Sequence, residues 1–178
     1  PGMSRHVPDH LLIGGTERRA QPELPVLASV MPALPTMYNA DGSINFQAQE
    51  DLMRHLVDQG IKGFVAMGTT GERALVNFQE HQAVIQHAIN VARKISSEKG
   101  EKIQIVAGVG ANASSEQNGL SRQAMNMGAD ANLILPPYYI KSQSQANLLR
   151  HLWQGLDAGP GIVYRVSGRT GIDIPDSM

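Results

Sequence analysis

The chain of 178 residues is built from short apolar runs that alternate with segments of helical periodicity. The apolar runs end at glycine, proline or polar residues and are too short for helices, which is typical of buried strands. The segments between them carry apolar residues three and four positions apart, as helices that cover a sheet do. This alternation predicts an α/β fold in which helical crossovers connect parallel strands.

The pattern predicts about five strands and four helices in the order β-α-β-α-β-α-β-α-β. The expected strands span residues 26–35, 63–67, 103–107, 131–135 and 161–166, and the expected helices span residues 46–59, 77–95, 114–127 and 144–156. Asn77 and Glu80 have the spacing of a capping box, Ser114 is a candidate N-cap, and Gly128 is placed to end a helix. The strand at 63–67 is expected to be buried on both faces.

Two parallel architectures fit this order, an open doubly wound sheet and a (β/α)8 TIM barrel. The glycine-rich dinucleotide fingerprint is missing after the first strand, and Gly108-Val109-Gly110 after the third strand lacks the final glycine. A full barrel needs eight strands and at least about 200 residues, so a barrel would be incomplete here. We expect residues 26–178 to form this domain and residues 1–25 to form a flexible extension, with Pro1-Gly2 as a tag remnant.

The composition narrows the classes of partner and compartment. A formal net charge of -1 gives no electrostatic reason to expect nucleic acid or an acidic membrane surface. The sequence has no cysteine, which excludes disulfides and thiolate metal sites and fits a reducing compartment, so we expect a cytoplasmic protein. The six histidines lack paired ligand spacing, and we expect neither a metal nor a cofactor. No apolar run approaches the roughly 20 residues that span a bilayer.

Three unusual clusters stand at the C-terminal ends of the second, fourth and fifth predicted strands: Gly68-Thr69-Thr70-Gly71-Glu72, Pro136-Pro137-Tyr138-Tyr139, and Tyr164 on the fifth strand followed by Gly168-Arg169-Thr170-Gly171. Each has a structural explanation when taken alone, because threonines stabilise tight turns and tyrosines pack. The carboxyl ends of parallel strands, however, share one edge of a sheet, and sites form there. Three clusters at one edge favour a binding or catalytic site.

These motifs resemble those of the dihydrodipicolinate synthase family and, less closely, those of the N-acetylneuraminate lyases. The resemblance runs from about Leu27 to the C-terminus. It implies the N-terminal part of a (β/α)8 barrel that assembles into homotetramers of tight dimers. It also implies a lyase of lysine (diaminopimelate) biosynthesis, in which a lysine forms a Schiff base with pyruvate and the enamine attacks aspartate semialdehyde.

The resemblance also implies residue roles. Tyr164 would be the general acid and base, and Thr69 would link it to Tyr139, which reaches into the site of a partner copy. A tyrosine hydroxyl titrates near pH 10, so such a chain of hydroxyls would help it to relay protons. Thr70 and Gly171 would bind substrate, with Thr70 on the pyruvate carboxylate. Arg169 would bind the carboxylate of the aldehyde, since a guanidinium matches that group.

A second group of residues falls where some family members bind lysine as a feedback effector. The group comprises His81, Asn112, Glu116 and Tyr138. The alternative interpretation of these residues is helix capping and ordinary packing.

The chain departs from the family pattern in two ways. The family's Schiff-base lysine lies on the strand after the one that carries the tyrosine, and this chain ends at Met178 before such a strand. We therefore expect no activity from the chain alone and association to cover its open sheet. The family's Tyr-Asn-Val-Pro-Ser is replaced by residues 164–168, which should loosen the loop before Arg169. The alternative is a non-catalytic truncated barrel that acts as a binding or assembly module.

Overall fold

A computed structural model describes residues 24–175 of the chain. The expected N-terminal extension, residues 1–25, lies outside the described residues except for Leu24 and Pro25. The elements follow the predicted alternation of helix and strand. In order they are α1 (Phe46–Asp58), β1 (Gly63–Ala66), α2 (Phe78–Lys99), β2 (Gln104–Gly108), α3 (Ser114–Met127), β3 (Ala131–Ile134), α4 (Gln145–Leu156), β4 (Gly161–Val163) and α5 (Ser167–Thr170).

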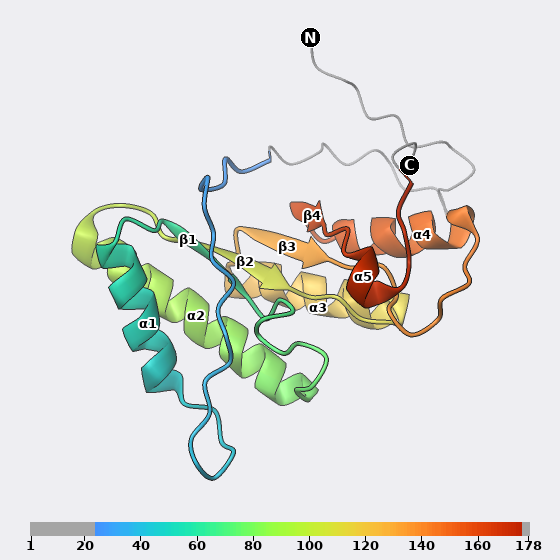
Figure 1. Ribbon diagram of the computed structural model, residues 1–178. Helices are drawn as coiled ribbons and strands as arrows, with labels where there is room; N and C mark the ends of the chain where they lie inside the picture. The colour runs from blue at the N-terminus through green and yellow to red at the C-terminus, as the bar shows by residue number, and fades with distance from the viewer. Residues whose placement is uncertain (1–23, 176–178) are drawn as a thin grey trace.

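The four strands form one parallel sheet in the order β1-β2-β3-β4, so neighbours in sequence are neighbours in space (Figure 1). Each pair is connected by a helix, which confirms the prediction of a parallel α/β sheet with helical crossovers. A parallel sheet that grows by one strand at a time in one direction is the arrangement of a barrel wall rather than of a doubly wound sheet.

The expected first strand, 26–35, does not join the sheet as a full strand. Ala33 forms a single parallel bridge with Val65 of β1, through hydrogen bonds from Leu34 N–H to Val65 O and from Val65 N–H to Pro32 O. Prolines at 32 and 35 lack the N–H that a ladder needs, which limits the pairing to this one point. The segment nevertheless lies at the position of a fifth strand, beside β1.

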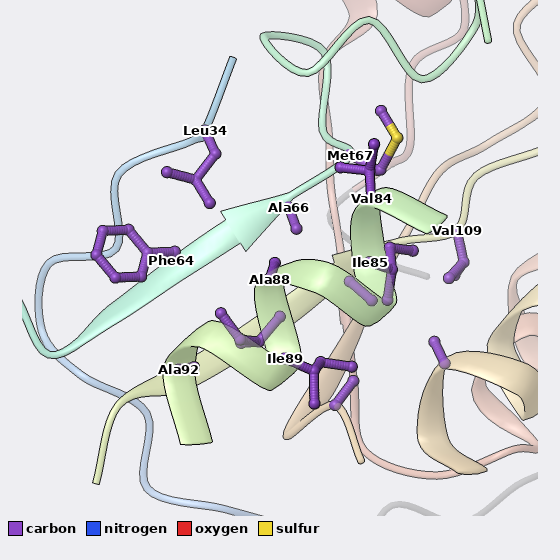
Figure 2. Close-up of a cluster of buried hydrophobic side chains, with 14 of the residues drawn as sticks. Leu34, Phe64, Ala66, Met67, Val84, Ile85, Ala88, Ile89, Ala92 and Val109 are labelled. Carbon is purple, nitrogen blue, oxygen red and sulfur yellow. The ribbon is translucent and has the colours of Figure 1, made fainter. Parts of the chain in front are cut away.

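The hydrophobic core lies between the sheet and its helices. Phe64 and Ala66 of β1 belong to one buried cluster with Ala88 and Ile89 of α2, and Figure 2 shows Ala66 beside Ala88. The alternate position, Val65, faces away and is only half-buried. The expectation that this strand is buried on both faces is therefore wrong at Val65. The other residues of the described range, 24–175, cover the face of β1 that carries Val65 only in part. Leu133 of β3 is half-buried in the same way.

Local signals in the sequence account for most helix ends. Asn77 and Glu80 form the predicted capping box at the start of α2, and Gly128 ends α3 with φ 102°. The prediction that Ser114 caps α3 is wrong. Ala113 occupies the N-cap without a side-chain bond, and the Ser114 hydroxyl bonds His151 instead. None of the helices within residues 24–175 is long and apolar enough to cross a membrane.

Candidate active site at the carboxyl edge of the sheet

The three predicted clusters lie on connections that leave the carboxyl ends of β1, β3 and β4. Because these strands are parallel members of one sheet, Thr69, Thr70, Tyr139, Tyr164 and Arg169 all follow strand ends at the same edge. The structure thus brings the predicted clusters to one rim. The contacts that hold each connection determine which of these side chains can act together.

The connection after β1 carries Thr69 and Thr70 on a constrained backbone. Met67 has φ 57° and Glu72 has φ 60°, a left-handed conformation that residues with a side chain rarely adopt. Such conformations cost on the order of 1–3 kcal/mol and persist where surrounding contacts enforce them. Between these two residues, Thr69 and Thr70 are exposed at the rim.

Two contacts enforce this backbone. The buried hydroxyl of Thr36, which follows the first extended segment, donates a hydrogen bond to Gly71 O at 2.6 Å. On the other side, β2 approaches so closely that a Cβ placed on Gly108 would lie 2.0 Å from Met67 O. Thr36 was not among the residues predicted for the site. Its position could have indicated its role, because Thr36 is a polar residue directly after the first apolar run, as the residues of the other clusters are after theirs.

The connection after β3 is held by Asn112, from the connection after β2. Its side-chain oxygen accepts hydrogen bonds from the backbone N–H groups of Tyr138 at 2.7 Å and Tyr139 at 3.0 Å. The ring of Tyr139 projects outward and is 83% exposed. The backbone of this tyrosine is therefore tied to the rim while its hydroxyl is presented to solvent.

A second anchor holds the start of the same connection. His151 of α4 bonds the carbonyl of Leu135 through Nε2 at 3.1 Å, and its Nδ1 bonds the Ser114 hydroxyl at 2.8 Å. With the proton on Nε2, the ring donates to the carbonyl and accepts from the hydroxyl. Burial lowers the pKa of His151, which favours this neutral form, while the bond to Leu135 acts in the opposite direction. This histidine was not predicted as a site residue, since it lies on a helix far from the motifs in the sequence.

Tyr164 and Arg169 follow β4, at the open side of the sheet. Strand β4 ends at Val163, but the N–H of Tyr164 continues the ladder by bonding Ile134 O at 2.9 Å. The prediction of a strand to residue 166 is too long, because the chain turns into α5. As the last strand of the sheet, β4 leaves Tyr164 38% exposed.

Arg169 lies within a single helical turn, α5, where the sequence predicted a loosened loop. Bonds from Thr170 N–H to Val166 O and from Gly171 N–H to Ser167 O close the turn. Arg165, expected on a buried strand, is exposed and pairs with Asp173 across the turn. These contacts order the segment although it lacks the family's proline.

The hydroxyls of the expected proton relay are not bonded to one another. Within residues 24–175, no hydrogen bond joins the side chains of Thr69, Tyr139 and Tyr164. All three are at least partly exposed at the same rim. The structure brings the segments together and leaves the hydroxyl groups open to further partners.

His81, Glu116 and Asn112 of the expected effector group form side-chain contacts within the described part of the chain, where Nδ1 of His81 is buried without a hydrogen-bond partner. His81, 1% exposed, bonds Gly108 O through Nε2 at 2.8 Å. Burial lowers the pKa of His81 to about 4, against the bond to Gly108, and the nearby charge of Arg73 lowers it further. The Glu116 carboxylate pairs with Arg73 at 3.3 Å, and Asn112 holds the tyrosine backbone as described above. These contacts also involve Arg73, which was not among the predicted residues of the group.

The lysines and acids of the described part do not suggest another centre. Residues 24–175 contain no group of three or more His, Asp or Glu side chains able to hold a metal ion. Four lysines pair with carboxylates: Lys62 with Glu101, Lys94 with Glu50, Lys99 with Asp58, and Lys102 with Asp130. The fifth, Lys141, lies on the connection after β3 at the rim of the candidate site.

Comparison with known proteins gives a consistent family. The Dihydrodipicolinate synthetase family matches residues 26–177. The 4-hydroxy-tetrahydrodipicolinate synthase of Thioalkalivibrio sulfidiphilus is 38% identical over 146 residues, which are 81% of this chain and 47% of that protein. The chain thus spans about half the length of the curated relatives it matches.

Solved structures agree with the sequence comparison. A dihydrodipicolinate synthase from Acinetobacter baumannii, determined in complex with pyruvate, has a TM-score of 0.72 at 37% identity and covers 80% of this chain and 47% of its own. The 4-hydroxy-tetrahydrodipicolinate synthase of Methylacidiphilum fumariolicum has a TM-score of 0.73 at 30% identity, and the match covers 82% of this chain and 46% of that protein. The described sheet and helices correspond to about half of a TIM barrel in these relatives. The chain belongs to the dihydrodipicolinate synthetase family.

Proposed function

We propose that this chain forms the pyruvate-binding half of the active site of a lyase of the 4-hydroxy-tetrahydrodipicolinate synthase type. The observation that carries the proposal is the common rim: hydroxyls after β1 and β4 and the guanidinium of Arg169 in α5 follow strand ends at the same edge of one parallel sheet. Pyruvate has a carboxylate and a carbonyl, and its condensation with an aldehyde requires proton transfers. Groups that bind carboxylates and groups that carry protons are the residue types gathered here.

Each rim residue has a proposed role in that reaction. Thr70, on the constrained connection after β1, donates to the pyruvate carboxylate through its hydroxyl. Tyr164 exchanges a proton with the oxygen of the pyruvate carbonyl and with the nitrogen that replaces it. Thr69 passes this proton on to the hydroxyl of a Tyr139. Arg169 binds the carboxylate of the aldehyde, while the left-handed Gly171 ends the turn that presents it.

We propose that the amine that forms the Schiff base does not come from this chain. Lys62, Lys94, Lys99 and Lys102 are held in ion pairs away from the rim. A nucleophilic amine needs a lowered pKa, through desolvation or a neighbouring cation. A carboxylate partner favours the charged ammonium, so it opposes that requirement. The remaining lysine, Lys141, is exposed.

We propose further that copies of the chain associate through the rim. Large apolar side chains are exposed on the connections after β1 and β3 and at the start of α2: Leu75, Tyr139, Ile140 and Phe78. Exposed apolar groups that cluster on one face of a soluble protein are typical of interaction surfaces. Association there would also place the outward Tyr139 against another copy, where its hydroxyl could complete the relay. In keeping with a cysteine-free sequence, we place this assembly in the cytoplasm.

The experiment is borohydride trapping with pyruvate. The 178-residue chain alone should give no reduced pyruvate adduct in the intact-mass spectrum. The chain mixed with the complementary half of a synthase relative should give an adduct, mapped by peptide analysis to a lysine of that half. Replacing Thr70 by valine and Tyr164 by phenylalanine in this chain should reduce the adduct at least tenfold, the ratio for the roughly 1.5–3 kcal/mol of a lost hydrogen bond to a charged group.

The matched control is Thr170→Val, which changes a threonine that is buried next to the rim and bonds only backbone carbonyls and N–H groups. If that variant remains folded, its adduct yield should be close to that of the unchanged chain. Full adduct formation by the Thr70→Val and Tyr164→Phe variants would overturn the proposed site. Absence of any adduct in the complemented sample, with both halves shown to associate, would favour a non-catalytic binding module.

A further inference from the structure

His151 of α4 lies between the start of α3 and the connection after β3, and it bonds both. Its Nδ1 is 2.8 Å from the Ser114 hydroxyl, and its Nε2 is 3.1 Å from Leu135 O. The side-chain nitrogen of Gln117, also on α3, lies 3.1 Å from the same Nε2. His151 and Gln117 are both buried, so water competes little for these bonds.

The Nε2 atom of His151 has two neighbours that require different protonation states of the ring. Leu135 O can only accept a hydrogen bond, and the amide nitrogen of Gln117 can only donate one. With the proton on Nε2, the ring donates to Leu135 O and accepts from the Ser114 hydroxyl, while Gln117 donates to His151 O at 3.3 Å. With the proton on Nδ1, Leu135 O loses the one donor that residues 24–175 provide for it. The first form therefore satisfies more groups.

The bond to Leu135 O is passed on to Tyr139 through a stiff segment. The next two residues, 136–137, are buried prolines whose rings fix the φ angle. Beyond them, the side-chain oxygen of Asn112 accepts from Tyr139 N–H at 3.0 Å. The start of the connection is thus fixed on both sides of the prolines, by His151 before them and by Asn112 after them.

The ring has no charged partner that would stabilise a second proton. Strands β3 and β4, which pack against α4, carry no titratable side chain. The other titratable groups of α3, of α4 and of the connection after β3 are Glu116, Arg122, Arg150, Tyr138, Tyr139 and Lys141. No charged side chain within residues 24–175 forms an ion pair or hydrogen bond with His151. Burial lowers its pKa, and only the bond to Leu135 acts against that.

A second proton on His151 would therefore create an unpaired cation in the interior, which is unfavourable until water reaches it. Helix α3 is held by α2, β3 and α4, whereas residues 139–142 of the connection are exposed. Local opening occurs where the fewest buried contacts are lost, so the connection should open first.

We propose that His151 is a positioning residue for Tyr139: with its proton on Nε2 it fixes the connection after β3, and a second proton on the ring releases that connection. The inference rests on the proposed function for one point, the role of Tyr139 in the proton relay. The relay is then assembled at neutral pH. It is dismantled as the pH falls below 6.5, because the open form keeps the ordinary pKa of histidine and binds the proton first.

The experiment observes the ring and the connection separately, by NMR on the isotope-labelled 178-residue chain. At neutral pH, the imidazole nitrogen spectrum of His151 should show a proton on Nε2 and none on Nδ1. The protection of the Tyr139 amide, corrected for intrinsic exchange, should fall by up to about tenfold for each pH unit below 6.5, while amides of β2 keep theirs. A proton on Nδ1, or protection of Tyr139 that follows β2 at every pH, would overturn the inference.

Two substitutions of the histidine separate its two roles. His151→Gln keeps a donor for Leu135 O but does not titrate, so Tyr139 should stay protected at low pH. His151→Leu removes the donor and should lower the protection at every pH. If the leucine variant does not fold, Ser114→Ala replaces it. This change removes the hydroxyl that bonds Nδ1 and keeps the ring, so a signal from a protonated Nδ1 should appear. Unaltered spectra and exchange in these variants would contradict the proposed role.

The matched control is His81→Gln, which changes a second buried histidine whose Nε2 bonds a backbone carbonyl, Gly108 O at 2.8 Å. His81 does not contact the connection after β3 through any hydrogen bond within residues 24–175. The control should leave the pH dependence of Tyr139 protection unchanged. If it abolishes that dependence as His151→Gln does, the release belongs to general acid destabilisation and the inference fails.

Trapping with pyruvate, in the sample complemented by the other half of a synthase relative, tests the connection to the reaction. His151→Leu should slow adduct formation at saturating pyruvate by about tenfold, less than the roughly 100-fold for loss of a proton-transfer group itself. The pyruvate concentration for half the maximal rate should not change, and His151→Gln should restore the rate. Equal rates in the leucine variant would remove the positioning role alone. If the unchanged chain gives no adduct, the proposed function fails, and the NMR results still support or overturn the hold of His151 on the connection.

Discussion

The side-chain oxygen of Asn112 accepts a hydrogen bond from the backbone N–H of Tyr139 at 3.0 Å, and this bond joins the connections after β2 and β3. The same oxygen accepts from Tyr138 N–H, so one side chain satisfies two successive backbone donors. Because an exposed loop has few other constraints, the orientation of Tyr139 depends strongly on this residue.

Replacing Asn112 by alanine should therefore release the loop without unfolding the domain. We expect amide hydrogen exchange of Tyr138 and Tyr139 to accelerate at least tenfold, while amides of β2 keep their protection. Asn112→Asp retains an acceptor oxygen of the same reach and should restore slow exchange. Unchanged exchange in the alanine variant would show that the loop is held by other contacts. Protection lost throughout the sheet would show that Asn112 is a general stability residue.

Gly108 should tolerate no side chain. A Cβ at this position would meet the carbonyl oxygen of Met67 at 2.0 Å, and both partners are backbone that cannot rotate away. Gly108→Ala should thus lower the free energy of unfolding by about 2 kcal/mol or more, measured by urea denaturation, because β1 and β2 must separate. Gly119→Ala is the matched control. Gly119 lies within α3 with open space around its Cβ position, so alanine there should stabilise by about 0.5–1 kcal/mol.

The stability of the domain should fall on mild acidification because of His81. The pKa of this histidine is lowered to about 4 in the folded chain, mainly by burial, against an ordinary value of 6.5. Between these two values the unfolded chain binds the proton and the folded chain does not, so the stability is complete above pH 6.5 and declines as the pH falls towards 4. The total loss is on the order of 3 kcal/mol, from about 1.4 kcal/mol for each pH unit.

His81→Gln tests this origin. Glutamine can still donate to Gly108 O but does not titrate, so denaturation at several pH values should show a smaller slope between pH 4 and 6.5. A residual slope of the same sign is expected from His151, whose pKa is also lowered by burial. A slope identical to that of the unchanged chain would assign the acid sensitivity to other groups.

Association should depend on the apolar rim. Leu75, 79% exposed on the connection after β1, is expected to be buried between copies. Leu75→Asp should weaken self-association by at least tenfold in sedimentation velocity, since burial of a leucine contributes about 1.5–3 kcal/mol. Val26→Asp is the control, because Val26 is 92% exposed next to the amino end of β2. Equal effects of the two variants, or none from Leu75, would place the interface elsewhere.

Secondary structure was largely readable from the sequence because the signals are local. The helix at 114–127 ends at Gly128 as predicted, and Asn77 with Glu80 forms the expected capping box. Capping and apolar periodicity act over a few residues, so they can be read without tertiary contacts. Errors arose where a distant partner competes. Ser114 bonds His151 of α4 instead of capping its own helix, and the prolines of the first segment reduce its pairing to one bridge.

The candidate site, too, was predictable from the sequence only in part. The sequence alone determined which residue types stand at strand ends, and the order of parallel strands then required Thr69, Tyr139, Tyr164 and Arg169 to share one rim. Only the tertiary structure decided how these residues are held. Asn112 bonds the Tyr139 backbone and Lys141 packs beside Gly171, although about 27 and 30 residues separate the partners in the chain. Contacts of that separation depend on how whole elements pack, and no local pattern in the chain encodes them.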